Sequence, residues 1–168
     1  DKPVVASLND IVANLTPMLS RILKKDIQFT SQLDPKLCNV RIDPAQIEQV
    51  VMNLVVNGQE AINSQEGIVA LNTSLVELAG SEIFITGKPR AGRYAKVSVR
   101  DNGQGMPKNV IEKIFEPFFT TKKGAGTGLG LSIVYGIIQS NDGHLMVESV
   151  EGKGTEFSFY FPEALEKV

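Results

Sequence analysis

The stretch Lys122-Lys123-Gly124-Ala125-Gly126-Thr127-Gly128-Leu129-Gly130 alternates four glycines with other residues, and a helical pattern of apolar side chains follows it. Because glycine loses the most backbone entropy on ordering, the run predicts a pliable loop and not a strand or a helix interior. A loop that opens onto a helix N-terminus offers unpaired amide groups and the positive end of the helix dipole to an anion. The stretch indicates either a phosphate-binding loop or a flexible linker.

Two common phosphate-loop motifs are excluded for this stretch. The chain contains no G-x-x-x-x-G-K-[ST] sequence. The dinucleotide-binding pattern G-x-G-x-x-G also fails, because Leu131 stands where its third glycine belongs. Nucleotide specificity has to come from other parts of the chain.

Composition predicts one soluble domain over residues 1–168. Of the residues, 42% are hydrophobic and 21% charged, which is typical of a globular protein. A net charge of −2 indicates no general attraction to nucleic acid or to an anionic membrane. Cys38, the lone cysteine, excludes an internal disulfide and suits a reducing compartment. With no pattern of a membrane span or signal peptide, we expect a cytoplasmic domain without direct membrane contact.

A helix start is clearly marked at Asp43-Pro44-Ala45-Gln46, where Asp43 suits the cap and Gln46 the return bond of a capping box. Core spacing continues from Ile47 to Val55. Asn53, Asn57 and Glu60 recur at i, i+4 and i+7 on a different face of this helix. They are either a solvated face or, through the amide oxygens, ligands for a hard cation such as Mg²⁺.

The remaining pattern predicts an α+β fold, a two-layer α/β sandwich whose mixed sheet is covered on one face by helices. Residues 5–25 read as a helix, with a kink or a late start near Thr16 because Pro17 lies inside it. Residues 79–93 read as a surface loop or hairpin. The segments that alternate as strands, two of them joined by a turn at 151–154, are 27–33, 37–42, 68–78, 94–100, 143–150 and 155–161.

Two further segments each have two interpretations. Asp101-Asn102-Gly103-Gln104-Gly105 follows a strand and is either a plain turn or a ligand-reading carboxylate with backbone close to a ring. Phe115, Phe118 and Phe119 are either core residues or a latch for a lid in front of the glycine loop.

Together these segments resemble the ATP-binding domain shared by sensor histidine kinases, DNA gyrase, Hsp90 and MutL, known as the Bergerat-type ATP-binding fold. The resemblance covers roughly the whole chain. Five boxes occur in order, namely the N box (53–57), G1 box (101–105), F box (115–119), G2 box (126–131) and a last glycine box (152–157). The F box and Thr120-Thr121-Lys122 look specifically like the histidine-kinase branch.

The resemblance implies specific roles around ATP and Mg²⁺. Asp101 would accept a hydrogen bond from the adenine amino group, Asn57 would coordinate Mg²⁺ with Asn53 beside it, and Thr155 would support Asp101 and a bridging water. Residues 101–130 would form the region of the ATP lid. The other implied ATP-binding residues are Gly103, Gly105, Phe119, Thr121, Lys122, Gly126, Thr127, Gly128, Leu129 and Gly130.

The resemblance also favours a kinase over a hydrolytic enzyme. ATPase branches carry a glutamate base at the position of Asn53, whose amide cannot accept a proton from water at neutral pH. Catalysis would then rest on positioning and charge neutralisation, with Asn53 and Lys122 as the catalytic residues. Gly58 departs from the usual alanine after the metal-binding asparagine, at about 1 kcal/mol in helix propensity.

The implied function is the catalytic domain of a bacterial two-component sensor histidine kinase, part of a phosphorelay. Its partners would be its own dimerisation and phosphoacceptor hairpin, which we expect to be absent from these residues, and the receiver domain of a response regulator. Residues 1–25 would link to that hairpin, and the parent protein can be membrane-anchored. We expect His144 to be structural, so the fragment alone would not phosphorylate itself. The alternatives are an ATPase or chaperone-type relative, an anti-sigma-type serine kinase and a non-catalytic binding module.

Overall fold

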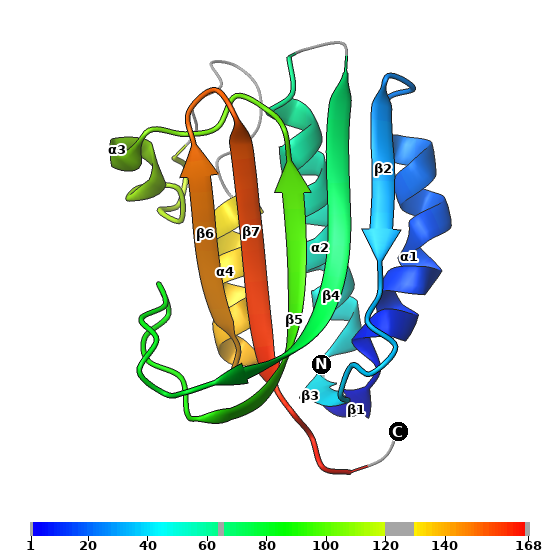
Figure 1. The fold of residues 1–168 in the computed structure, drawn as a ribbon, viewed down its shortest axis with the longest axis vertical. Coiled ribbons are helices and arrows are strands. Elements are labelled where there is room, and N and C mark those ends of the chain that lie inside the picture. Colours follow the sequence, from blue (N-terminus) through cyan, green and yellow to red (C-terminus); the bar gives the residue numbers. More distant parts are fainter. Residues whose placement is uncertain (1, 64–65, 120–129, 167–168) are drawn as a thin grey trace.

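The structure, a computed structural model, describes residues 2–63, 66–119 and 130–166. A five-stranded sheet forms one layer, and helices cover one of its faces (Figure 1). The α+β sandwich expected from the sequence is confirmed. The elements in chain order are β1 (Val4–Ala6), α1 (Leu8–Ile22), β2 (Ile27–Gln32), β3 (Val40–Ile42), α2 (Pro44–Glu60), β4 (Gly67–Leu78), β5 (Gly92–Asp101), α3 (Lys108–Ile111), α4 (Gly130–Ser140), β6 (His144–Val150) and β7 (Gly154–Pro162).

The sheet has the strand order β2-β4-β5-β7-β6 and is mixed. Only β2 and β4 pair in parallel, and the other three pairs are antiparallel. β1 and β3 form a separate two-stranded antiparallel sheet beside it. The register sets Val69, Asp101, Thr155 and Ser149 opposite one another in a row across four strands. This row lies at the end of the sheet where β5 stops.

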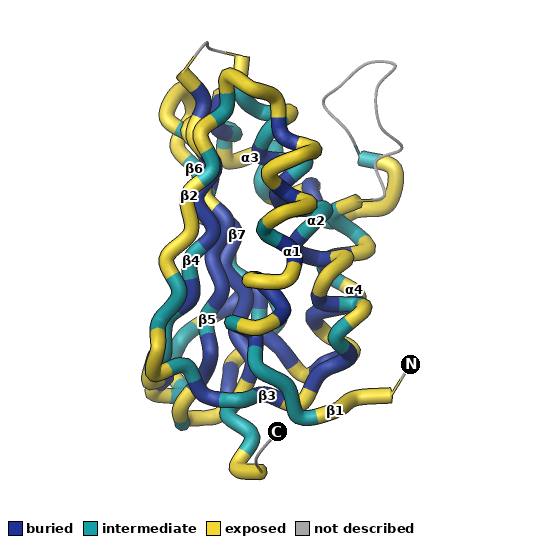
Figure 2. The backbone as a smooth tube through the Cα atoms, turned by 90° about the vertical axis from the view of Figure 1, so that its right-hand side faces the viewer, coloured by how far each residue is buried: buried dark blue, intermediate teal, exposed yellow. Residues whose placement is uncertain are grey.

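The core fills the space between the sheet and the helices, as the buried segments in Figure 2 show. Leu54 and Val51 of α2 face Phe157 and Phe159 of β7 in one continuous apolar cluster. Each fully buried side chain of this size stabilises the fold by about 1.5–3 kcal/mol. Cys38 is buried in the same cluster. Among the helices of the described residues, none combines the length and the apolar character that crossing a membrane requires.

The first helix differs from its expected form at its start. It begins at Leu8 and continues through Pro17, so the late start near Thr16 is wrong. Ser7 caps the helix by accepting a hydrogen bond from the backbone N–H of Asp10. Leu15 and Leu19 are buried on either side of Pro17, and this burial outweighs the hydrogen bond that proline cannot donate. Residues 4–6, expected in the helix, form β1.

The second helix starts where its motif predicts, but the capping box does not close on itself. Asp43 accepts from the Ala45 N–H at 3.1 Å, as a cap does. The N–H of Asp43 donates to the Asn141 side chain at 2.9 Å, and Asn141 donates in turn to the Gln46 side chain at 2.9 Å. The buried Asn141, at the end of α4, therefore completes the cap of α2 and fastens the two helices together.

The end of α4 depends on a left-handed residue followed by a close approach. Asp142 has φ of 59°, a conformation that glycine adopts at lower cost than aspartate. Gly143 donates to the Ile138 carbonyl at 2.9 Å and closes the helix. A Cβ at Gly143 would lie 2.6 Å from the Phe161 ring, so no side chain fits there.

We predict opposite effects for substitutions at these two neighbouring positions. Asp142→Gly should raise the free energy of unfolding by about 0.5 kcal/mol, because glycine relieves the left-handed backbone. Gly143→Ala should lower it by about 1–3 kcal/mol through overlap with Phe161. Urea unfolding of both variants measures this difference. Equal effects of the two substitutions would contradict the assignment.

Candidate functional site

The candidate site is built around Asp101, the last residue of β5. Its carboxylate is 5% exposed, and its Oδ1 accepts the backbone N–H of Gly103 at 2.8 Å. Burial raises the pKa of Asp101 to about 6, and backbone hydrogen bonds from Gly103 and Thr155 oppose that rise. A buried carboxylate with so few partners is costly to ionise unless a ligand supplies a further donor.

Helix α2 approaches Asp101 at Gly58. A Cβ on Gly58 would lie 3.3 Å from Cβ of Asp101 and 3.4 Å from its Oδ2, which is tight contact. The glycine in this helix therefore has a packing reason that offsets its low helix propensity. Its neighbour Asn57 lies at the same level of α2 as the buried carboxylate.

The two asparagines of α2 are half-buried and one helical turn apart. Nδ2 of Asn53 donates to the backbone carbonyl of Gly130 at 3.4 Å, which links α2 to the first residue of α4. Asn53 is therefore not simply part of a solvated face. The role of Asn53 and Asn57 as metal ligands stays a prediction. Among residues 2–63, 66–119 and 130–166, no group of three or more His, Cys, Asp or Glu side chains is arranged for a metal ion.

The residues after Asp101 do form a turn, so both interpretations of this segment apply to different side chains. Asn102 accepts the Ile68 N–H at 2.7 Å and donates to the Glu66 carbonyl at 2.9 Å. Its amide thereby closes the turn onto the start of β4. This leaves the neighbouring Asp101 side chain directed toward α2.

Two glycines let this turn pack against its surroundings. A Cβ on Gly103 would overlap the Ala61 carbonyl at the end of α2. Gly105 has φ of 66°, and a Cβ there would overlap the carbonyl of Val150. Gln104 lies between them, donating its N–H to the Ala61 carbonyl at 2.9 Å and accepting from Gly152. These contacts fix the turn between α2 and the β6–β7 connection.

Thr155 and Ser149 extend the site across β7 and β6. Thr155 is 5% exposed and lies opposite Asp101 in the strand register. Its Oγ1 lies 2.8 Å from Oγ of Ser149, which faces it on β6. The sequence analysis did not single out Ser149. Its signal was the hairpin turn at 151–154, which sets Ser149 opposite Thr155.

The three phenylalanines of the F box have different environments. Phe115 packs against Tyr135 and Phe157, at ring-centroid distances of 5.7 and 6.4 Å, so the core interpretation is confirmed for this residue. It is wrong for Phe118, which is 73% exposed with φ of 68°. Phe119 is half-buried beside the core. Among the expected site residues, Thr121, Lys122, Gly126, Thr127, Gly128 and Leu129 lie outside the described residues.

His144 has a structural environment, as its sequence context predicted. Its ring stacks on Phe84 at 5.3 Å, and its Nδ1 lies 2.9 Å from the Thr86 hydroxyl. Burial lowers the pKa of His144, so the ring is neutral at pH 7. These contacts hold the loop between β4 and β5 against β6.

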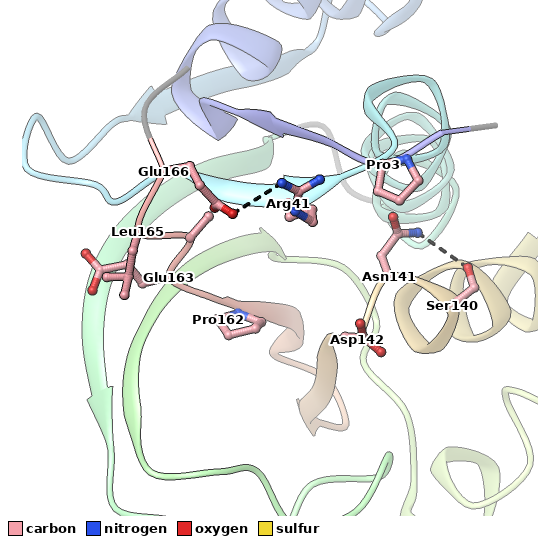
Figure 3. Close-up of a pocket in the computed structure, with 10 residues that line it drawn as sticks. Pro3, Arg41, Ser140, Asn141, Asp142, Pro162, Glu163, Leu165 and Glu166 are labelled. Atoms are coloured by element: carbon pink, nitrogen blue, oxygen red, sulfur yellow. Dashed lines mark hydrogen bonds and ion pairs between the residues drawn. The ribbon is translucent and has the colours of Figure 1, made fainter.

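A separate cavity of about 370 Å³ lies between the end of α4 and the C-terminal segment (Figure 3). Arg41 and Glu166 form an ion pair at 3.3 Å in its wall. Pro162, also in the wall, is seven residues along β7 from Thr155, or about 23 Å. The cavity is thus at the opposite end of the sheet from Asp101 and is not part of the candidate site.

Comparison with known proteins gives a consistent family. Residues 42–165 match the model of the histidine kinase-, DNA gyrase B- and HSP90-like ATPases. The chain is 41% identical over 168 residues to the sensor kinase CckA of Brucella abortus (strain 2308), covering 99% of this chain and 18% of that protein. It is 36% identical to the sensor histidine kinase ZraS of Klebsiella oxytoca, covering 92% of this chain and 30% of that protein.

Solved structures agree with this family. The catalytic domain of the histidine kinase ThkA matches with a TM-score of 0.75 and 30% identity, covering 97% of each chain. ThkA in complex with the response regulator protein TrrA matches with a TM-score of 0.72 and 28% identity, covering 99% of this chain and 43% of that one. The chain thus spans less than a third of the two curated relatives and nearly all of a catalytic domain. It belongs to the family of histidine kinase-, DNA gyrase B- and HSP90-like ATPases, as an ATP-binding catalytic domain of the sensor histidine kinase type.

Proposed function

We propose that this domain binds Mg-ATP and transfers the γ-phosphoryl group to a histidine on the dimerisation hairpin of its parent protein, for onward transfer to a response regulator. The observation that carries the proposal is the buried Asp101 carboxylate at the junction of β5 and α2. The domain would work on the cytoplasmic side, where ATP is available, even where the parent protein is membrane-anchored.

Asp101 supplies base recognition in this proposal. Its Oδ1 is held by the Gly103 N–H, which fixes the orientation of the carboxylate. A buried acceptor of this kind suits the exocyclic amine of adenine, whereas guanine presents a carbonyl oxygen at that position. Gly58 and Gly103 keep side chains away from the carboxylate. Thr155 and the glycine turn at 103–105 form the surroundings.

Asn53 and Asn57 supply the metal side. Bound Mg²⁺ would neutralise phosphate charge and hold the phosphates in line for transfer. The amide oxygens of the two asparagines are hard neutral ligands one helical turn apart on α2. Asn53 also contacts Gly130, the first residue of α4, so the N-terminal end of that helix lies beside the proposed phosphate position.

The chemistry of Asn53 favours phosphoryl transfer over hydrolysis. Its amide donates to the Gly130 carbonyl and has no basic atom that can take a proton from water. Activation of water would then be poor, which leaves the phosphoryl group for a histidine acceptor. Lys122, which lies outside the described residues, is proposed to neutralise phosphate charge.

His144 is not proposed as the acceptor. Its ring is half-buried, stacked on Phe84 and hydrogen-bonded to Thr86, so it cannot reach a nucleotide near Asp101 without unfolding the loop. The acceptor would be supplied by a hairpin outside this chain. The ThkA complex with TrrA supports a receiver domain as the later partner.

The first test is nucleotide specificity. We expect calorimetric titration to detect Mg-ATP binding and no comparable Mg-GTP binding. Asp101→Asn should weaken ATP binding by about 1–3 kcal/mol, since it removes a charged partner from a buried site. Mixing the domain with the separate phosphoacceptor hairpin and labelled ATP should then label the hairpin. Failure to bind ATP, or steady hydrolysis without labelling, would contradict the proposal.

The second test uses the raised pKa of Asp101. Because the folded state holds the proton more tightly than the unfolded chain, Asp101 stabilises the nucleotide-free fold most below about pH 4. This stability is lost as the pH rises to about 6. Asp101→Asn cannot titrate. Its unfolding free energy relative to wild type should rise by up to about 3 kcal/mol between pH 4 and pH 7.

Urea unfolding across this pH range measures the difference between the two proteins. The comparison cancels the titration of all other groups. A difference that stays constant with pH would show that Asp101 ionises normally and is not buried as described.

The third test concerns the metal. Asn57→Ala should remove the Mg²⁺ dependence of ATP binding, because an alanine offers no oxygen ligand. Gln49→Ala, on the exposed part of the same helix, is the matched control and should keep that dependence. Titrations with ATP in Mg²⁺ and in EDTA measure both variants. An unchanged Mg²⁺ dependence in Asn57→Ala would place the ligand elsewhere.

A further inference from the structure

Three polar side chains form a row across the end of the sheet beside the candidate nucleotide site. Ser149 on β6 lies opposite Thr155 on β7, and Thr155 lies opposite Asp101 on β5. Side chains directly opposite on antiparallel strands share one face, with Cβ atoms about 5 Å apart. Asp101 faces α2, so all three lie on the helix-covered side of the sheet. Ser149 thus belongs to the same polar row as the proposed base-reading carboxylate.

The Ser149 hydroxyl makes three contacts. Its Oγ accepts the backbone N–H of Met106 at 2.8 Å. It lies 3.1 Å from the carbonyl oxygen of Gly154 and 2.8 Å from Oγ1 of Thr155. The Gly154 carbonyl can only accept, whereas either hydroxyl can donate to the other.

Counting protons decides which hydroxyl donates. A serine hydroxyl has one proton and two lone pairs. All three contacts are hydrogen bonds at once only if Ser149 donates to Gly154 and accepts from both Met106 and Thr155. The single proton of Thr155 is then directed to Ser149. Oγ1 of Thr155 is left with acceptor capacity only.

We propose that Ser149 is a positioning residue that fixes the Thr155 hydroxyl as a hydrogen-bond acceptor beside Asp101. The end of the sheet then presents two acceptors, the Asp101 carboxylate and Oγ1 of Thr155. This pair suits a ligand edge that donates, namely the exocyclic amine of adenine, directly or through a water. The inference rests on the proposed function and adds a residue that controls base specificity without touching the nucleotide.

Ser149 also steadies the turn that orients Asp101. Met106, held by Ser149, directly follows the glycine turn at 103–105, and the Gly103 N–H holds the carboxylate. The same turn is held on its other side by the bond from Gln104 to Ala61. Loss of the Ser149 hydroxyl therefore frees the Thr155 proton and one side of the turn, while the contact with α2 remains.

The test compares two nucleotides that differ only in the amine. Ser149→Ala and Ser149→Thr are titrated by calorimetry with Mg-ATP and with the magnesium complex of purine riboside triphosphate, which lacks the 6-amino group. Ser149→Ala should bind ATP about fivefold to tenfold more weakly, the scale of one hydrogen bond, and the analogue less than twofold more weakly. Ser149→Thr keeps the hydroxyl and should restore ATP binding to within twofold of wild type.

Ser158→Ala is the matched control. Ser158 is 2% exposed on β7, as Thr155 is buried there, but it lies between the core residues Phe157 and Phe159 in sequence and so points to the opposite face. This variant should bind both nucleotides as wild type does. Thermal unfolding of each variant checks that the fold is retained at the temperature of the titration.

Each outcome bears on one proposal. An equal loss for both nucleotides in Ser149→Ala, or unchanged ATP binding, would overturn the role of Ser149 while leaving the proposed function standing. No rescue by Ser149→Thr would overturn it as well. Wild-type protein that fails to bind ATP would instead overturn the proposed function itself.

Discussion

The burial of one carboxylate against one helix is the constraint on which the rest of the site depends. Asp101 ends β5 under α2, and Gly58 is the residue that permits α2 to come so close. A side chain at Gly58 would press on the carboxylate, and one at Gly103 would push the following turn away from Ala61. The backbone of three segments is therefore adjusted around a single acidic group.

This arrangement is unfavourable for the empty domain. A carboxylate that is 5% exposed with a pKa near 6 is ionised at pH 7 at the expense of folding stability. An apolar residue or an amide at the same position would fold more easily. The retention of an acid there is explained by a ligand that donates a hydrogen bond to it, which is the pattern expected where function is bought with stability.

Two asparagines at opposite ends of the α2–α4 pair hold the helix layer together. Asn141, buried at the end of α4, joins the cap of α2 through Asp43 and Gln46. Asn53 joins the middle of α2 to Gly130 at the start of α4. The two helices are thus fixed in relation to each other on both sides of the core. The metal-binding face proposed for Asn53 and Asn57 takes its position from this pairing.

The sequence by itself determined the elements, the fold class and the short motifs of the site, because these depend on local spacing. Alternation marked the strands, the Asp43-Pro44 start marked α2, and Asp101 was recognisable as a carboxylate at a strand end followed by glycines. The start of α1 was missed because the penalty of Pro17 is local, whereas the burial of Leu15 and Leu19 that overrides it is tertiary. Phe118 was assigned to the core on residue type, and its exposure follows from where the chain turns.

Only the tertiary structure decided which groups meet across the site. That Gly58 faces Asp101, that Asn141 caps α2 and that Ser149 holds Thr155 all join residues far apart in the chain. Sequence spacing cannot specify such pairs, since they are set by strand register and by the distance at which helices pack on a sheet. The composition of the site was therefore readable from the chain, while its hydrogen-bond pattern and the raised pKa of Asp101 required the folded arrangement, because burial and partners exist only there.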